Sequence, residues 1–226
     1  MTVGISTPIS TGVFGGVSAA FRLGEPHGLA EGAVIREAVA LHVTVSAPPV
    51  SVIQAGFGAP STSISTQIFA LRRLLNDNIS GETGQLFASV AKGVLPLVVT
   101  VNSADAMVAL LRMKKDVEQQ QTQGRTKIKM VFMQAVEAHI VAKEIAQENV
   151  GVILNPLRPF PVTHDERRIV PGPPLSQETH LTTLLKHNIT VAVGIREEWE
   201  AINTRFALKW VRRIGASPCC PAFIGC

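Results

Sequence analysis

The stretch that decides the fold is PLVVTV, Pro96–Val101, a nearly continuous apolar run followed by a long amphipathic segment. A strand that is apolar throughout is typical of a parallel sheet buried on both faces. Ser103 can cap a helix behind this run, and apolar residues then recur at helical spacing from Met107 to Val117. The stretch therefore predicts a strand followed by a helix that packs on the sheet.

The same unit recurs along the rest of the chain. Three more apolar runs predict strands: KIKMVFM (Lys127–Met133), VGVIL (Val150–Leu154) and ITVAV (Ile189–Val193). We expect a helix after each of them, over about 136–148, from a Ser176 cap to about 187, and from 196 onward. Strands that alternate with amphipathic helices predict an α/β fold with a parallel sheet covered by helices. An open sheet and a (β/α) barrel both fit this pattern, but no Gly-rich phosphate loop follows any strand.

The first sixty residues have a different composition, rich in Gly, Ser, Pro and Ala. A short apolar run lies at 3–5, and the alternating, β-branched run at 41–45 predicts a strand. The breakers between 46 and 65 predict a loop. One amphipathic helix is expected over 65–76.

Composition excludes several classes of function. Tyr is absent, aromatic residues make up only 5% of the chain and no long Lys/Arg block occurs, so we expect no nucleic-acid partner. No run approaches the ~20 apolar residues of a membrane span, and we expect no membrane partner. The N-terminus has no secretory signal, which predicts a cytoplasmic location. All three Cys lie in the last eight residues, so the body is not built on disulfides.

Polar residues at the strand ends are the candidate site residues, because the carboxyl ends of parallel strands carry the chemistry of α/β folds. We expect a small-molecule pocket there. The candidates are Thr100, Asn102, Gln134, Glu137, His139, Arg158, His164, Asp165 and Arg196.

None of these candidates forms a strong catalytic motif, and each has a structural alternative. Glu137 and His139 are two residues apart on a predicted helix, so they diverge by about 200° and cannot chelate one ion together. His164 and Asp165 fit an acid/base group or a solvated loop. The arginines at 158, 167 and 168 fit an anion clamp or ordinary ion pairs with Asp165 and Glu166.

Four longer phrases resemble the later strands of amidohydrolase-related proteins, the group that includes imidazolonepropionase-like and other metal-dependent hydrolases. They are PLVVTVNSADAM (96–107), VEAHIVAKEIAQENVGVIL (136–154), RRIVPGPPLS (167–176) and ITVAVGIREEWEAINTRF (189–206). RPFPVTHDERR (158–168) and NTRF (203–206) are most similar to members of fungal type. The resemblance implies a partial TIM-like (β/α) barrel over residues 1–210, with 211–226 as an irregular Cys- and Pro-containing tail.

The resemblance also implies a divalent metal such as zinc, which lowers the pKa of a bound water for hydrolysis of non-peptide C–N bonds. Active members place His and Asp at strand ends where this sequence has Thr100, Asn102, Gln134 and Arg196. A hydroxyl, two carboxamides and a guanidinium are poor replacements for imidazole and carboxylate ligands. We therefore expect no metal cofactor and a chain without the family's catalysis.

Two other hypotheses remain open from the sequence. The chain is an active hydrolase that uses unfamiliar ligands such as His139, His164 and Asp165, or that receives them from a preceding part of a longer protein. Alternatively, it is a non-catalytic scaffold or oligomer subunit. Because an incomplete barrel leaves strand edges exposed, we also expect self-association.

Overall fold

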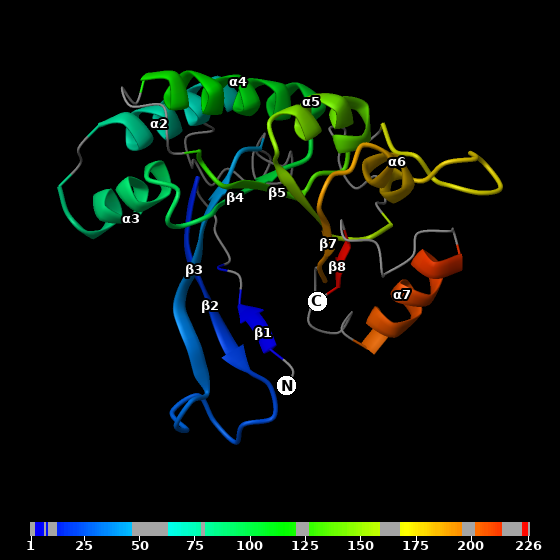
Figure 1. Cartoon of the computed structure of the whole chain (residues 1–226), viewed down its shortest axis with the longest axis horizontal. Coiled ribbons are helices and arrows are strands. Elements are labelled where there is room, and N and C mark those ends of the chain that lie inside the picture. The colour runs from blue at the N-terminus through cyan, green and yellow to red at the C-terminus, as the bar shows by residue number, and fades with distance from the viewer. Residues whose placement is uncertain are drawn as a thin grey trace, which may run out of the picture. The chain divides into compact units, whose positions relative to one another are not determined.

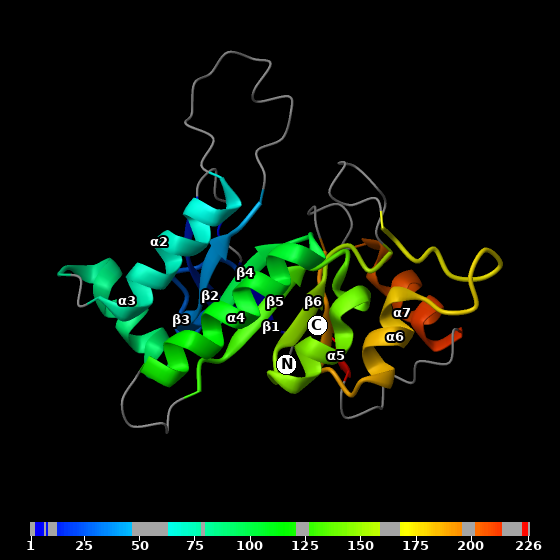
Figure 2. The same ribbon diagram turned by 90° about the horizontal axis from the view of Figure 1, so that it is seen from above.

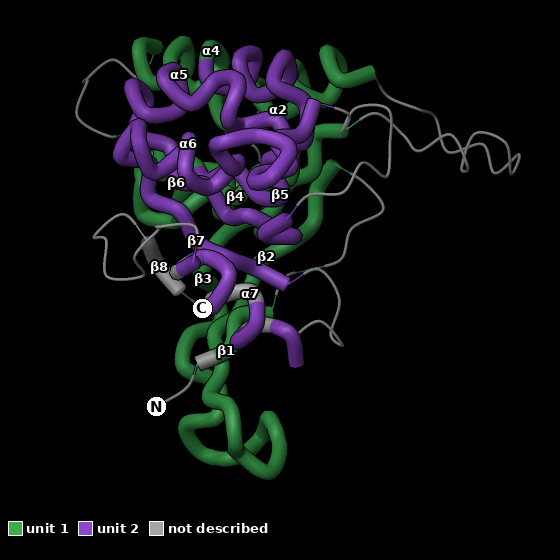
Figure 3. Tube along the Cα trace, turned by 90° about the vertical axis from the view of Figure 1, so that its right-hand side faces the viewer, with its two compact units in different colours: residues 1–47, 60–100, 112–130 green, residues 48–59, 101–111, 131–226 purple. Residues whose placement is uncertain are grey.

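The computed structural model describes residues 3–6, 8, 13–46, 63–77, 80–120, 127–158, 168–195, 202–213 and 223–225 (Figure 1). The chain divides into two compact units (Figure 3). The first unit comprises residues 1–47, 60–100 and 112–130, and the second comprises 48–59, 101–111 and 131–226.

The first unit combines antiparallel and parallel strand pairing. Strands β1 (Val3–Ser6), β2 (Phe14–Arg22) and β3 (Val34–Thr44) pair antiparallel in that order. The long β2–β3 hairpin is the blue arm of Figure 1. Strand β4 (Leu97–Val101) then runs parallel to β3, with Leu41 level with Leu97. The Leu97 N–H donates to the carbonyl of Lys129 at 2.8 Å, which brings the segment before β5 alongside β4.

The helices of the first unit supply its core. They are α2 (Ile64–Asn76), α3 (Glu82–Ala91) and the second half of α4 (Ala104–Gln120). Ser63 caps α2, because its hydroxyl accepts the N–H of Thr66 at 3.2 Å. Leu71 of α2, Phe87 of α3 and Val117 of α4 are all fully buried. The amphipathic face of each helix therefore packs inward, as periodicity requires.

The second unit holds four parallel strands in sequence order: β5 (Met130–Gln134), β6 (Gly151–Leu154), β7 (Val191–Val193) and β8 (Phe223–Gly225). Phe132, Val152 and Val191 lie on one sheet face and are fully buried, whereas the alternating residues are half-buried. The helical elements are η1 (Ala138–Val141), α5 (Ala142–Gln147), α6 (His180–Lys186) and α7 (Thr204–Arg213), seen from above in Figure 2.

The α/β class is confirmed. The apolar runs PLVVTV, VGVIL and ITVAV contain the strands β4, β6 and β7, and KIKMVFM contains all of β5 except its last residue, Gln134. No helix among the described residues is long and apolar enough to cross a membrane. The tail predicted to be irregular contains the end of α7 and the strand β8.

Two helix predictions are wrong in detail. The helix expected over 136–148 is replaced by a turn of 3-10 helix and the short α5. Ser176 does not cap α6, because its hydroxyl accepts the Gly172 N–H at 2.9 Å and donates to the Glu178 carbonyl at 2.7 Å within a turn. Thr179 is the cap, and Thr179 and Thr182 exchange side chain-to-backbone hydrogen bonds.

Candidate binding site at the strand ends

Two carboxamides meet at the carboxyl ends of the strands. Asn102 follows β4 and Gln134 ends β5, and Nδ2 of Asn102 donates to Oε1 of Gln134 at 3.1 Å. Gln134 and Ala135 have φ angles of 67° and 50°, in the left-handed region that non-glycine residues seldom adopt. Backbone strain of this kind persists only where the surroundings enforce it, and it is concentrated at functional sites.

A third carboxamide stands at the end of the next strand. Asn155 follows Leu154, the last residue of β6, and Leu154 is level with Gln134. Oδ1 of Asn155 is buried and has no hydrogen-bond partner among the described groups. Gly194 lies against it, since a Cβ at that position would come within 3.4 Å of Asn155 Cβ. The second unit therefore presents Asn102, Gln134 and Asn155 along one edge of its sheet.

Thr100 belongs to the first unit and is half-buried on β4. Its carbonyl accepts the Val45 N–H at 2.9 Å, so its backbone is part of the β3–β4 pairing.

Glu137 is a buried carboxylate held by three hydrogen bonds. Arg168 donates from Nε to Oε1 at 2.8 Å and from Nη2 to Oε2 at 2.6 Å, and the Ala104 N–H donates to Oε2 at 3.0 Å. Burial acts to raise the pKa of Glu137, but the Arg168 and Ala104 bonds outweigh it and hold that pKa below its usual range. Arg168 also lies 3.6 Å from Asp105. Glu137 therefore joins the start of α4 to the loop before α6.

Two histidines of the second unit lie edge to face. The rings of His139 in η1 and His180 in α6 have centroids 5.2 Å apart at 62°. Both ring nitrogens of His180, and Nδ1 of His139, are buried without hydrogen-bond partners among the described residues. Burial lowers the pKa of His139, and burial followed by the nearby His139 lowers the pKa of His180 to about 3. Both imidazoles are therefore neutral at physiological pH.

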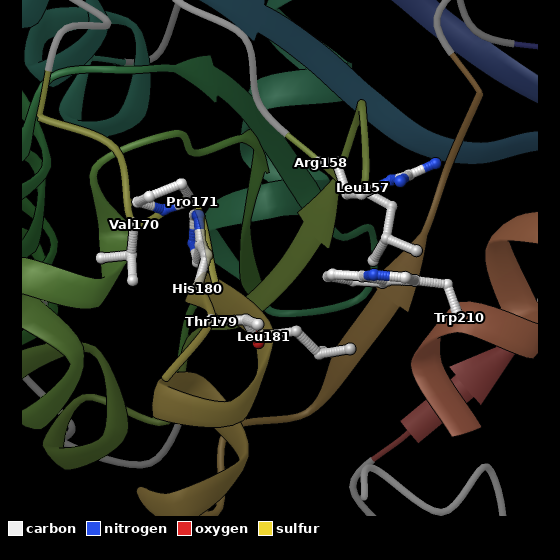
Figure 4. A pocket seen from close by; sticks show the side chains of 8 residues that line it. All are labelled: Leu157, Arg158, Val170, Pro171, Thr179, His180, Leu181 and Trp210. Carbon is white, nitrogen blue, oxygen red and sulfur yellow. The ribbon is translucent and has the colours of Figure 1, made fainter. Parts of the chain in front are cut away.

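His180 also lines a small hollow (Figure 4). Its walls are Leu157, Arg158, Val170, Pro171, Thr179, His180, Leu181 and Trp210. The guanidinium of Arg158 lies over the rings of Phe206 and Trp210 of α7, at 5.5 and 5.3 Å from the ring centroids. Figure 4 shows this guanidinium pointing away from His180.

The structure brings some sequence candidates together and separates others. Asn102 meets Gln134, whereas Glu137 pairs with Arg168 and not with His139. Arg158 stacks on α7, and Arg168 pairs with Glu137. Asp165 and Glu166, the partners in one of the two interpretations of these arginines, lie outside the described residues. His164, Asp165 and Arg196 lie outside the described residues.

His180 is a site residue that is not among the candidates predicted from the sequence. If Ser176 caps the helix, His180 lies on the second turn, where a histidine does not by itself indicate a functional site. Had Thr179 been recognised as the cap, His180 would have been the first residue of a helix at the carboxyl edge of the sheet.

The described residues do not fit the metal that the family resemblance implies. They contain no group of three or more His, Cys, Asp or Glu side chains that could hold an ion together. The strand ends present carboxamides, and the carboxylate of Glu137 already accepts hydrogen bonds from Arg168 and the Ala104 N–H. Catalytic zinc usually takes three imidazole, thiolate or carboxylate ligands, so no catalytic step is derived through a metal.

No protein-family model matches the sequence. The amidohydrolase tasK of Hapsidospora irregularis is 38% identical over 118 residues, a match that covers 46% of this chain and 12% of that protein. The crystal structure of an amidohydrolase from Thermotoga maritima MSB8 has a TM-score of 0.69 at 13% identity. That similarity covers 96% of this chain and 61% of the bacterial chain, and it concerns the fold alone. The partial sequence match and the shared fold support a relationship to the amidohydrolases, and the chain spans about an eighth of the length of the matched fungal protein.

Proposed function

We propose that this chain binds a small neutral polar molecule at the strand ends and does not catalyse metal-dependent hydrolysis. The observation that carries the proposal is the hydrogen bond between Asn102 and Gln134, at the positions where the family resemblance implies metal ligands. Carboxamides offer both donors and acceptors but no charge, and they match the edges of amides and ureas.

The state of Glu137 supports the same proposal. A general base must be free to accept a proton from water or substrate. Glu137 accepts two hydrogen bonds from Arg168 and one from a backbone N–H, and its lowered pKa makes it a weak base. Its interactions are those of a structural ion pair.

A second candidate function rests on the two histidines. His139 and His180 are neutral and keep unpartnered ring nitrogens, which is the form in which imidazole binds metals or accepts protons. An active hydrolase with unfamiliar ligands would use these two residues. They supply two ligands, whereas a catalytic zinc site usually needs three.

The test is a binding experiment that includes matched variants. Small amides, lactams and cyclic ureas are titrated into the purified chain by calorimetry, and the same mixtures are assayed for hydrolysis. Gln134→Met keeps a side chain of similar length but removes the carboxamide. It should weaken binding about tenfold or more, because one or two buried hydrogen bonds are lost. Gln85→Met, on the exposed surface of α3, is the control and should change nothing.

Two outcomes contradict this proposal. Turnover of any of these compounds, abolished by His139→Ala or His180→Ala, would establish the active-hydrolase function. Binding that is equally strong in wild type and Gln134→Met would place the ligand elsewhere on the chain.

A further inference from the structure

The exposed side of the helix α7 is basic. Its sequence, TRFALKWVRR, contains arginines and a lysine but no acidic residue. Arg205, Lys209 and Arg213 recur at every fourth position, so they form one stripe along the helix, and all three side chains are exposed. Val211 lies on the opposite side of the helix and is fully buried. The stripe therefore faces solvent.

Arg158 adds a further cation beside this stripe. Its guanidinium lies 5.5 Å from the ring centroid of Phe206 and 5.3 Å from that of Trp210, the residues that follow Arg205 and Lys209 in the sequence. Figure 4 shows the guanidinium directed away from the hollow. Contacts with ring faces hold the cation in place through its charge, so its N–H groups remain available to an acceptor. We call the following residues the basic face: Arg158, Arg205, Lys209 and Arg213.

The charges of the basic face are not neutralised by the part of the chain that the structure describes. Arg168 and Lys186, in the same unit, pair with acidic side chains, but no described acidic group forms an ion pair with a cation of the basic face. Helix stability does not explain the stripe. The helix dipole favours a cation in the last turn, as at Arg213, but disfavours one in the first turn, where Arg205 lies.

The spacing of the stripe matches an extended acidic segment. A helix rises about 1.5 Å per residue, so cations four residues apart are separated by about 6 Å along its axis. In an extended chain, side chains at alternate positions point to one side and lie about 6.6 Å apart. Carboxylates at alternate positions can therefore meet Arg205, Lys209 and Arg213 in turn, whereas one small anion reaches only part of the stripe.

The apolar surroundings of the stripe favour a protein as the partner. Phe206 is 61% exposed, and Ile202, just before the helix, is 86% exposed. Arginine and large aromatic side chains are enriched at protein–protein interfaces. A lipid surface requires a broader apolar face than Ile202 and Phe206 provide, and single-stranded nucleic acid requires aromatic platforms for successive bases.

We propose that the basic face of α7 is a docking surface for an extended acidic segment of a partner protein, with carboxylates at alternate positions. These carboxylates pair with Arg205, Lys209 and Arg213, and the N–H groups of Arg158 donate to a further acceptor at the flank. The proposal does not depend on ligand binding at the strand ends, because neither Asn102 nor Gln134 belongs to the basic face.

The test uses the full chain and fluorescently labelled synthetic peptides. Glutamate alternates with serine in the first peptide, the second has the same composition with its glutamates adjacent, and the third has glutamine in place of glutamate. Fluorescence anisotropy at about 0.1 M salt should show saturable binding of the alternating peptide, about threefold weaker binding of the clustered peptide and at least tenfold weaker binding of the glutamine peptide. Exposed charges are screened by salt, so about 1 M salt should abolish the binding.

Two matched charge reversals locate the site. Lys209→Glu changes the middle of the stripe and should weaken binding of the alternating peptide at least fivefold, because it removes one ion pair and adds a repulsion. Lys143→Glu makes the same charge change at an exposed position of α5 and should leave binding within twofold of wild type. Both lysines are exposed, so neither change disturbs the core. Equal binding by these two variants would overturn the proposal.

Competition separates a protein partner from other anionic partners. Vesicles of phosphatidylserine and phosphatidylcholine, and an oligothymidylate, are each added to the complex with the labelled alternating peptide. We expect both to compete more weakly than the unlabelled peptide does. If either binds more tightly than the peptide and loses that binding in Lys209→Glu, the basic face serves lipid or nucleic acid and the proposal is wrong. Failure of the alternating peptide to saturate would also overturn it, because the chain would then neutralise this face itself.

Discussion

Arg168 is the residue on which the buried charge of Glu137 depends. Glu137 is fully buried and Arg168 is half-exposed, so removing the arginine leaves an unpaired buried carboxylate, whereas removing the glutamate leaves a cation that water can reach. We expect Arg168→Met to lower the free energy of unfolding at pH 7 by about 2–4 kcal/mol, and Glu137→Gln by less.

The pH dependence of this loss follows from the lowered pKa of Glu137. A carboxylate whose folded pKa lies below its unfolded value stabilises the fold above the unfolded pKa and loses that contribution as the pH falls through the folded pKa. The difference between wild type and Arg168→Met should therefore shrink toward acid pH in urea titrations. Arg72→Met breaks the exposed pair with Asp116 and is the control, with an expected cost below about 1 kcal/mol. Equal costs for the two arginine variants would contradict the account.

The lowered pKa of His180 should also make the free energy of unfolding depend on pH. Its folded pKa of about 3 lies below the ordinary value of 6.5, so between these values the unfolded chain binds a proton that the folded chain excludes. The contribution of His180 is constant above pH 6.5 and is lost as the pH falls toward 3. Between pH 7.5 and 4.5 it should cost about 2–3 kcal/mol of stability.

The neutral variant His180→Gln should lose less stability than wild type over the same range, and His187→Gln should behave like wild type. The measurement is urea unfolding at both pH values. An unchanged pH dependence in His180→Gln would mean that the imidazole is protonated or accessible in the folded chain.

At the scale of structural elements, the stability of α6 depends on its capping residue. Thr179 is buried and exchanges hydrogen bonds with Thr182, so Thr179→Ala should lower stability by about 1–2 kcal/mol and speed hydrogen exchange at the amide of Thr182. Ser176→Ala removes hydrogen bonds in the preceding turn and should leave that amide protected. If the Thr182 amide exchanged faster in Ser176→Ala but not in Thr179→Ala, Ser176 and not Thr179 would be the cap.

Some strands can be predicted from the sequence pattern and others cannot. The strands β4 to β7 follow from their apolar runs, because each is buried on at least one face. Most of β2 is half-buried, contains Gly15 and Gly16 and has irregular register with β3, so it shows no alternation to recognise. The helix α3 follows Gly81, which supplies no side-chain cap, so no capping residue marks its start in the sequence.

The site is predicted less well than the sheet for a physical reason. The positions of Asn102 and Gln134 follow from strand ends, which local pattern reveals. The pairing of Glu137 with Arg168 joins residues 31 apart, and the contact of His139 with His180 joins two different helical elements. Such contacts depend on how loops return to the sheet, which periodicity does not encode.

For the molecule as a whole, we predict self-association. Among the described strands β1 pairs only with β2, which leaves one edge of β1 open, and Ile5 on it is 56% exposed. Open edges with apolar side chains favour pairing between chains. Light scattering should report a species larger than the monomer, reduced by Ile5→Lys. A compact, monodisperse monomer with a sharp melting transition would contradict this expectation.

The metal content of the chain separates the proposed binding function from metal-dependent hydrolysis. Elemental analysis of the purified chain for zinc, manganese and iron is the most direct test, made on a variant with Cys219, Cys220 and Cys226 changed to Ser so that tail thiolates cannot scavenge zinc. The account predicts well below one equivalent of each metal per chain, with no gain after incubation with zinc and dialysis. About one equivalent of tightly held metal, lost on His139→Ala or His180→Ala, would contradict it and establish the chain as a metal-binding amidohydrolase with an unfamiliar ligand set.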